Sequence, residues 1–154
     1  MRPVFLLIAG AAVAWLGLLL AAPILPAPVS AAIYLAGSFI CHQRPERSFH
    51  LDGAQLPVCA RCLGIYTGAA IGAVMAPFLG YVRHARMSIV TALVPAVASL
   101  AVEWVGWSPL SNAIRAATGV IAGTVVAAVV LATLHYEQCA PRPPIAPPPP
   151  QTRI

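Results

Sequence analysis

Long runs of apolar residues dominate the pattern of this sequence, and four of them are long enough to cross a lipid bilayer as helices. These runs cover residues 4–22, 63–82, 87–107 and 112–134. A helix rises about 1.5 Å per residue, so about 20 residues span a hydrocarbon core of about 30 Å. The pattern therefore predicts an all-α integral membrane protein, a helical bundle of four transmembrane helices.

The first apolar run is also compatible with a secretory signal peptide, because Arg2 precedes it and small residues follow near Ser30. The run is longer than the apolar core of about 7–15 residues in signal peptides, so we expect a retained span. Three prolines then interrupt the chain, and residues 29–40 are apolar over only 12 positions. That segment is too short to cross the bilayer and predicts a short re-entrant or interfacial helix.

One integral membrane domain is expected over residues 1–136, followed by a tail of different composition over residues 137–154. Seven of the ten residues from 141 to 150 are proline. Proline-rich segments adopt extended conformations without internal hydrogen bonds. We therefore predict that the tail is disordered.

The composition supports a membrane environment and excludes an ordinary soluble globule. Hydrophobic residues make up 60% of the chain and charged residues only 8%, whereas soluble domains average about 25% charged residues. The net charge of +5 comes from arginines scattered among the apolar runs, without the aromatic-interleaved basic patch typical of nucleic-acid-binding proteins. We expect the lipid bilayer as a partner and no nucleic acid, and the sequence identifies no protein partner.

Four spans place both termini on one side of the membrane and the polar segment 41–62 on the other. The four arginines on the side of the polar segment face five on the terminal side, which are Arg2, Arg83, Arg86, Arg142 and Arg153. Positive charge is enriched in short cytoplasmic loops. This slight excess predicts a multi-pass protein of the cell membrane with cytoplasmic termini.

The polar segment carries a Cys-His pair at Cys41 and His42 and a Cys-x-x-Cys motif at Cys59 and Cys62. Two thiolates at this spacing can bind one tetrahedral ion, and Gly64 after them is typical of the tight turn of a zinc knuckle. Three thiolates and one imidazole complete a tetrahedral site and select zinc over hard cations. We therefore predict a zinc site formed by these two pairs.

His50 is the alternative to His42 as the fourth ligand, because adjacent Cys41 and His42 side chains can both ligate only with an unusual backbone. A disulfide would use the three cysteines of the polar segment in pairs and leave one over, which favours a metal. Cys139 lies beyond the last span, across the membrane, and should be dispensable.

Two other functions stay open for the cysteines. In a membrane thiol–disulfide protein, the start of a helix and the neighbouring Arg61 would lower the pKa of Cys62. The layout resembles that of quinone-linked membrane thiol oxidases, but the next connection on that face, residues 108–111, lacks their second cysteine pair. In a non-catalytic membrane interaction protein, the cysteines would form an inert disulfide or stay unliganded.

Arginines of the same segment form a candidate anion site. Arg44, Arg47 and Arg61 can together bind the phosphate of a lipid head group. The alternative is that these arginines are solvated or paired with Glu46 and Asp52.

Glu103 and Arg115 lie near the ends of two spans that meet on the face of the polar segment. Ionisable groups inside a span are expensive and usually face a partner or a wet cavity. Their opposite charges and similar depth predict an ion pair. If a metal in the polar segment is catalytic, Glu103 is the candidate general base, and both residues are catalytic candidates.

Small residues recur every four positions in the second span, at Gly64, Gly68, Gly72 and Ala76, and the last span has Gly119 and Gly123 in the same relation. This spacing allows two helices to approach closely. We expect these glycines to serve packing.

The motif residues resemble a known family. They are Cys41-His42-Gln43, Arg47-Ser48-Phe49, Pro57-Val58-Cys59-Ala60-Arg61-Cys62 and Gly64-Ile65-Tyr66, followed by Ser111-Asn112-Ala113-Ile114-Arg115 with Thr118-Gly119. Over about residues 35–125 the chain resembles the domain-of-unknown-function family 2085 (DUF2085), predicted multi-pass membrane proteins of bacteria and archaea. Leu63 stands where that family often has a small residue or threonine, and the family often has aspartate near the position of Glu103. The resemblance implies a helical membrane bundle and no established activity.

Overall fold

Four helices in the computed structural model are long and apolar enough to cross a membrane, as predicted. The structure describes residues 3–79, 82–107 and 110–139. Within these ranges the long helices are α1 (Pro3–Ala21), α3 (Ala60–Met75), α4 (Ala85–Trp104) and α5 (Asn112–Cys139). Arg2, Ser108, Pro109, Arg142, Arg153 and residues 140–154 of the predicted tail lie outside the described residues.

The helix ends differ from the predicted ones by a few residues. Helix α3 begins at Ala60, earlier than predicted, and is extended by the short 3-10 helix Ala76–Phe78. Helix α5 continues to Cys139, past the predicted end of the span and into the segment predicted to be a disordered tail. Helix α4 ends at Trp104, and Gly106 with a φ of 75° redirects the chain after it.

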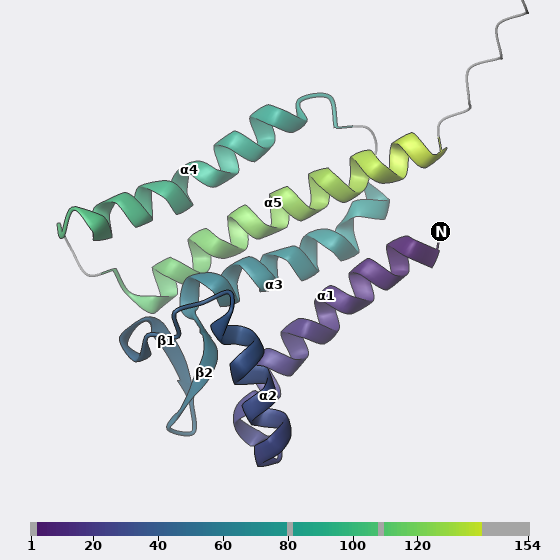
Figure 1. The fold of residues 1–154 in the computed structure, drawn as a ribbon. Coiled ribbons are helices and arrows are strands. Elements are labelled where there is room, and N and C mark those ends of the chain that lie inside the picture. The colour runs from purple at the N-terminus through teal and green to yellow at the C-terminus, as the bar shows by residue number, and fades with distance from the viewer. Residues whose placement is uncertain (1–2, 80–81, 108–109, 140–154) are drawn as a thin grey trace, which may run out of the picture.

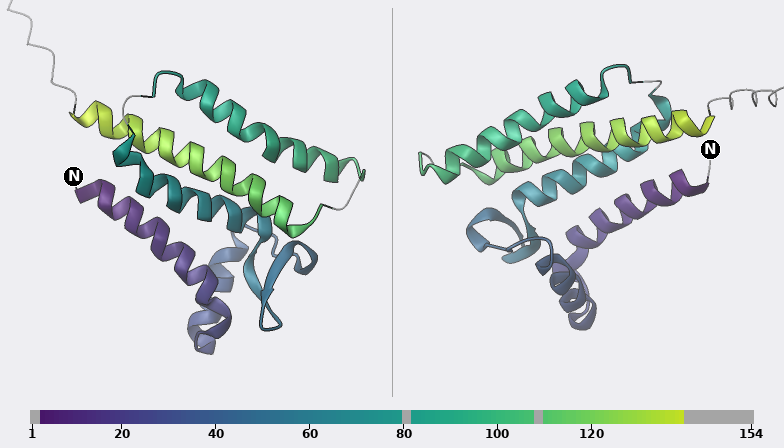
Figure 2. Two further views of the ribbon diagram at one scale, coloured as in Figure 1. Left: turned by 180° about the vertical axis from the view of Figure 1, so that it is seen from behind. Right: turned by 45° about the horizontal axis from the view of Figure 1, so that its top comes forward.

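The four spanning helices stand side by side in the order α1, α3, α5, α4 (Figures 1 and 2). Helix α3 contacts α1 on one side and α5 on the other, and α4 packs on the far side of α5. The outer helices leave large apolar residues exposed, as in Leu7 at 70% and Val97 at 62%. Lipid therefore solvates most of the surface of α1 and α4.

Helices α3 and α5 pack through the glycines that the sequence singled out. A Cβ atom at Gly68 would collide with the backbone carbonyl of Val120, and one at Gly123 would collide with that of Ile65. Gly64 meets the backbone of α5 in the same way, so it lies inside helix α3 and packs there. The predicted tight turn at Gly64 is wrong, because the helix already begins at Ala60.

The short apolar segment after α1 forms helix α2 (Ala27–Ser38), 12 residues long. It lies beside the strands at the end of α1 away from the N-terminus (Figure 1), and it does not run along the spanning helices in either view of Figure 2. In this helix, the side chain of Ile33 packs with Leu19 of α1 and Val58 of β2. This position agrees with the predicted interfacial helix.

A β-hairpin, which the sequence analysis missed, replaces most of the expected polar loop. Strands β1 (Ser48–Leu51) and β2 (Ala54–Cys59) pair antiparallel across Asp52 and Gly53, both with positive φ (50° and 84°). An Asp-Gly pair is a strong signal for such a two-residue turn. The register shifts between Ser48 and His50, so the middle of β2, which contains a proline without an N–H donor, lies at an irregularity of the ladder.

Prediction for the helix contact: Gly68→Val should strongly destabilise the protein, because its side chain has to displace the backbone of α5. Overpacking in a dense core costs about 1–3 kcal/mol or more. Gly10→Val in α1 is the matched control, because nothing lies within 4 Å of the position that a Cβ atom would take there. Thermal unfolding in detergent measures both variants. Equal melting temperatures for the two would refute the close contact.

Candidate metal and anion site

Three cysteines from separate elements meet at the start of α3. Cys41 follows α2, Cys59 ends strand β2 and caps α3, and Cys62 lies in the first turn of that helix. Their sulfur atoms all lie within 4.8 Å of one another, and the Cys59 and Cys62 sulfurs are 3.4 Å apart. All three are free thiols. The arrangement can hold one metal ion.

Backbone packing and hydrogen bonds fix the Cys41 segment against the hairpin. The backbone N–H of Cys59 donates to the Cys41 sulfur at 3.1 Å. The side-chain amide of Gln43 donates to the carbonyl oxygens of Tyr34 (2.7 Å) and Pro57 (2.8 Å), which links the segment to both α2 and β2. Cys41 is buried, and so is the neighbouring Val58. The three-cysteine cluster is therefore packed against buried apolar residues.

The electrostatics of the cluster favour a thiolate at Cys59. The hydrogen bond that it shares with the Cys62 sulfur lowers the pKa of the Cys59 thiol to about 5, and burial opposes this effect. The start of a helix also stabilises negative charge. A thiolate is the form that binds metals and attacks disulfides.

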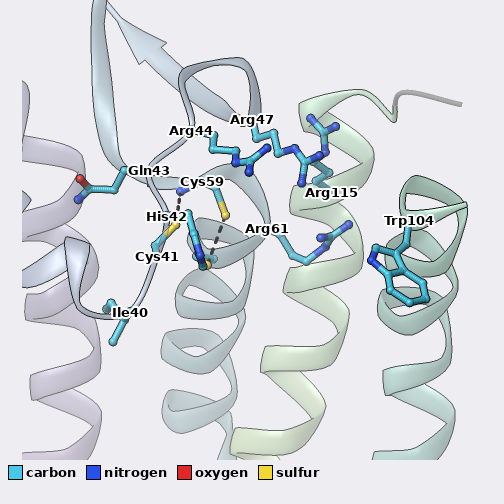
Figure 3. A pocket seen from close by; sticks show the side chains of 11 residues that line it. Ile40, Cys41, His42, Gln43, Arg44, Arg47, Cys59, Arg61, Trp104 and Arg115 are labelled. Atoms are coloured by element: carbon cyan, nitrogen blue, oxygen red, sulfur yellow. Dashed lines mark hydrogen bonds between the residues drawn. The ribbon is translucent and has the colours of Figure 1, made fainter. Parts of the chain in front are cut away.

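The two candidate histidines are placed differently. His42 is exposed and lines the same pocket as the three cysteines (Figure 3). His50 lies in β1 opposite Gln55 and is not a lining residue of that pocket. Neither imidazole belongs to the three-sulfur group found among the described residues.

The pocket beside the cysteines has a volume of about 620 Å³ and is rich in arginine. Figure 3 shows guanidinium groups from the loop, from α3 and from α5 on one side of it, with the indole of Trp104 on α4 as a further wall. The cations that line it are Arg44, Arg47, Arg61 and Arg115. Three of these are the predicted anion-binding residues, and the fold brings them together.

Glu103 lies among these arginines, and its side chain is only 5% exposed. The Nε of Arg115 donates to it at 2.6 Å, so the predicted ion pair is present. Arg61 approaches the other carboxylate oxygen at 3.5 Å and Arg47 at 3.9 Å. One carboxylate therefore faces three cations, an arrangement that the sequence analysis did not foresee.

Arg44, the fourth arginine of the pocket, forms no ion pair with Glu103 among the described residues. The two acidic residues expected as partners of the arginines, Glu46 and Asp52, lie elsewhere in the segment. Arg44 and Glu46 are 4.0 Å apart and both well exposed, which makes this a weak surface contact. Asp52 serves the hairpin turn.

Two polar motif residues, Ser48 and Asn112, to which the sequence assigned no role, connect the site to the hairpin. Asn112 accepts a hydrogen bond from Arg115 at 2.7 Å and donates to the carbonyl of Ser48 at 3.0 Å. The buried hydroxyl of Ser48 donates to the carbonyl of Arg44 at 2.9 Å. This relay also fixes Asn112 and the polar segment on one face of the protein, as the four-span topology predicts. The signal in the sequence for such a contact is the polar residue Asn112 at the start of a membrane span.

The fold and site define a multi-spanning helical membrane protein with a three-cysteine cluster and an arginine-rich pocket on one face. Residues 41–129 match the family described as "Predicted membrane protein (DUF2085)". This chain belongs to that family. The matched range begins at Cys41 and includes all three clustered cysteines, Glu103 and Arg115.

Two archaeal relatives are similar to this chain. An uncharacterized protein of Methanocaldococcus jannaschii is 36% identical over 107 residues, which cover 67% of this chain and 69% of the relative. An uncharacterized protein of Methanothermobacter thermautotrophicus is 34% identical over 100 residues, which cover 63% of this chain and 89% of the relative. No solved structure matches the chain.

Prediction for the buried carboxylate: Glu103→Gln should destabilise the protein by about 3–5 kcal/mol, the usual cost of leaving a buried charge without its partner. Glu46→Gln is the matched control, because Glu46 makes one exposed contact at 4.0 Å; its effect should stay below about 1 kcal/mol. Denaturant unfolding in detergent measures both. If the two variants unfold alike, the arginines do not depend on Glu103.

Proposed function

We propose that the protein is a membrane metalloprotein that binds zinc through Cys41, Cys59 and Cys62. The observation that supports this most directly is the meeting of three free sulfur atoms within 4.8 Å of one another. Thiolates select zinc over hard cations such as magnesium. A disulfide would pair two of the sulfurs and leave the third buried beside them without a role.

His42 is our candidate for the fourth ligand, because it follows Cys41 directly and lines the same pocket. Zinc with three protein ligands keeps one position for water or a substrate, and zinc with four is closed. The site is therefore structural if His42 binds the ion and open toward the arginines if it does not. Zinc content and affinity of a His42 variant separate these two states.

The second part of the proposal is that the arginine pocket binds the phosphate of a lipid head group. Arg44 and Arg47 have side chains that are 59% and 40% exposed, so they are accessible to a ligand. Arg61 and Arg115 are more buried and are oriented by Glu103. Four guanidinium groups against the two carboxylates of Glu103 and Glu46 leave an excess of positive charge, which suits a phosphate.

Glu103 acts in this proposal as a positioning residue. The pocket's lining includes Arg61 and Arg115 but not Glu103. Its carboxylate is already engaged by three arginines, which argues against the role of general base that the sequence suggested. Arg115, hydrogen-bonded to Glu103 and Asn112, holds the geometry of the same cluster.

Thiol–disulfide chemistry is the second candidate function. The sulfurs of Cys59 and Cys62 are 3.4 Å apart, and the lowered pKa of Cys59 favours a nucleophilic thiolate. Oxidation of this pair would form one S–S bond, release two protons and pass two electrons to a membrane quinone. The second cysteine pair of the membrane thiol oxidases is missing from residues 105–111.

Prediction for zinc: the purified protein should contain about one zinc ion, because three thiolates and one further ligand complete a tetrahedral site. Serine substitution of Cys41, Cys59 or Cys62 should each abolish binding, and His42→Ala should weaken it. Cys139→Ser is the matched control and should leave the zinc content unchanged. Elemental analysis with a parallel thiol count measures these outcomes.

Two results would contradict the zinc proposal. If Cys139→Ser removes zinc as completely as Cys59→Ser, both the site and the topology are wrong. If zinc is absent from every variant and the thiol count finds Cys59 and Cys62 oxidised, the thiol–disulfide function replaces it.

Prediction for orientation: the protein resides in the cell membrane with cytoplasmic termini, so the metal and anion site faces outward. Arg83, just before α4, and Arg86, in the first turn of α4, line a pocket at the end opposite to the cysteines, on the terminal side. A fluorescent reporter fused after residue 154 should fluoresce, and a phosphatase that folds only outside the cytoplasm should be inactive there. The reverse pattern would invert the orientation.

A further inference from the structure

An apolar groove runs along the membrane-spanning part of the protein. Its volume is about 460 Å³, and residues from all four spanning helices line it. Among them are Ile8 of α1, Ile65 and Ala69 of α3, Leu93 of α4, and Val126 of α5. Ile65 and Leu93 are each 39% exposed, so the groove is open to the bilayer.

The groove continues the helix faces that carry the arginine pocket. On α3, Arg61, Ile65 and Ala69 follow one another at intervals of four residues, which places them on one side of the helix. On α5, Arg115 and Val126 are eleven residues apart, close to three full turns. The same two helix faces therefore carry cations near the hairpin and apolar side chains farther into the membrane.

A polar contact among three side chains separates the arginine pocket from the apolar groove. The guanidinium of Arg61 donates to the hydroxyl of Ser99 at 3.2 Å, and that hydroxyl lies 3.5 Å from the hydroxyl of Thr118. Farther along α5 the groove is lined by apolar residues from Ala122 to Leu131. At about 1.5 Å per residue this stretch is about 14 Å long, close to half of a hydrocarbon core of about 30 Å.

We propose that the groove holds the hydrocarbon tail of the same lipid whose phosphate binds the arginines. This inference rests on the proposed function and names its ligand class: an amphiphile with a phosphate head and a tail about one leaflet long. Charge complementarity at the arginine pocket, and an apolar groove farther along the same helix faces beyond the polar contact, define this occupant. Lipid enters from the bilayer through the open face of the groove, without passing through water.

The test compares three probes with the purified full-length protein in detergent: hexadecyl phosphate, hexadecanol and inorganic phosphate. Native mass spectrometry measures the bound fraction of each. Hexadecyl phosphate should bind about tenfold more tightly than either of the other two, a difference of about 1.4 kcal/mol. The advantage comes from engaging the arginines and the groove with one molecule.

Val126→Trp should fill the groove and remove the advantage of hexadecyl phosphate while leaving phosphate binding unchanged. Val97→Trp is the matched control, because Val97 is 62% exposed on α4 and does not line the groove. Ala69→Leu is a smaller groove-filling change that serves if the tryptophan prevents folding. Arg61→Gln should weaken the binding of both phosphate probes.

Each contrary outcome identifies the part of the account that fails. If hexadecyl phosphate binds no better than phosphate and Arg61→Gln weakens both, the groove inference is overturned and the anion pocket stands. If hexadecyl phosphate binds no better than hexadecanol and Arg61→Gln has no effect, the head-group site and the inference both fall. A dimer that Val126→Trp dissociates would place a second copy in the groove, and the inference would be overturned.

Discussion

The backbones of α3 and α5 touch along a line of glycines, and the positions of Arg61 and Arg115 in the site depend on that contact. Gly64 and Gly68 admit the carbonyls of α5, and Gly119 admits that of Arg61. Larger residues would separate the helices, and Arg61 on α3 would no longer reach the carboxylate that Arg115 on α5 binds. The same contact fixes the start of α3, where two of the three clustered cysteines lie.

The charged cluster is stable because it lies at the end of the spans and is internally paired. An isolated charge in a low-dielectric region carries a large desolvation penalty, and a hydrogen-bonded partner offsets much of it. Glu103 supplies that partner for Arg115, while Arg44 and Arg47 extend into the exposed segment. The paired groups maintain the geometry of the pocket that we propose as the anion site. A zinc ion held by three thiolates would add one negative charge beside them.

The sequence was sufficient for the spans, the helix contact and the Glu103–Arg115 pair, because these follow from hydropathy, small-residue spacing and the cost of charge in a membrane. The sequence was insufficient for the hairpin, although Asp52-Gly53 is typical of its turn. The strand that contains Pro57 is irregular and lacks the alternation of apolar and polar residues that marks a regular strand. The approach of Arg61 to Glu103 depends on how the helices pack, and that of Arg47 depends on how the segment before the hairpin lies over the helix ends. Long-range pairing of this kind leaves no local pattern.

The proposed function requires all three sulfur atoms to be ligands of one ion. X-ray absorption at the zinc edge of the purified protein tests it most directly, because scattering distances distinguish sulfur from lighter ligands. We expect three sulfur atoms at about 2.3 Å and one nitrogen or oxygen at about 2.0 Å from zinc. A first shell of nitrogen and oxygen alone, without sulfur, would contradict it.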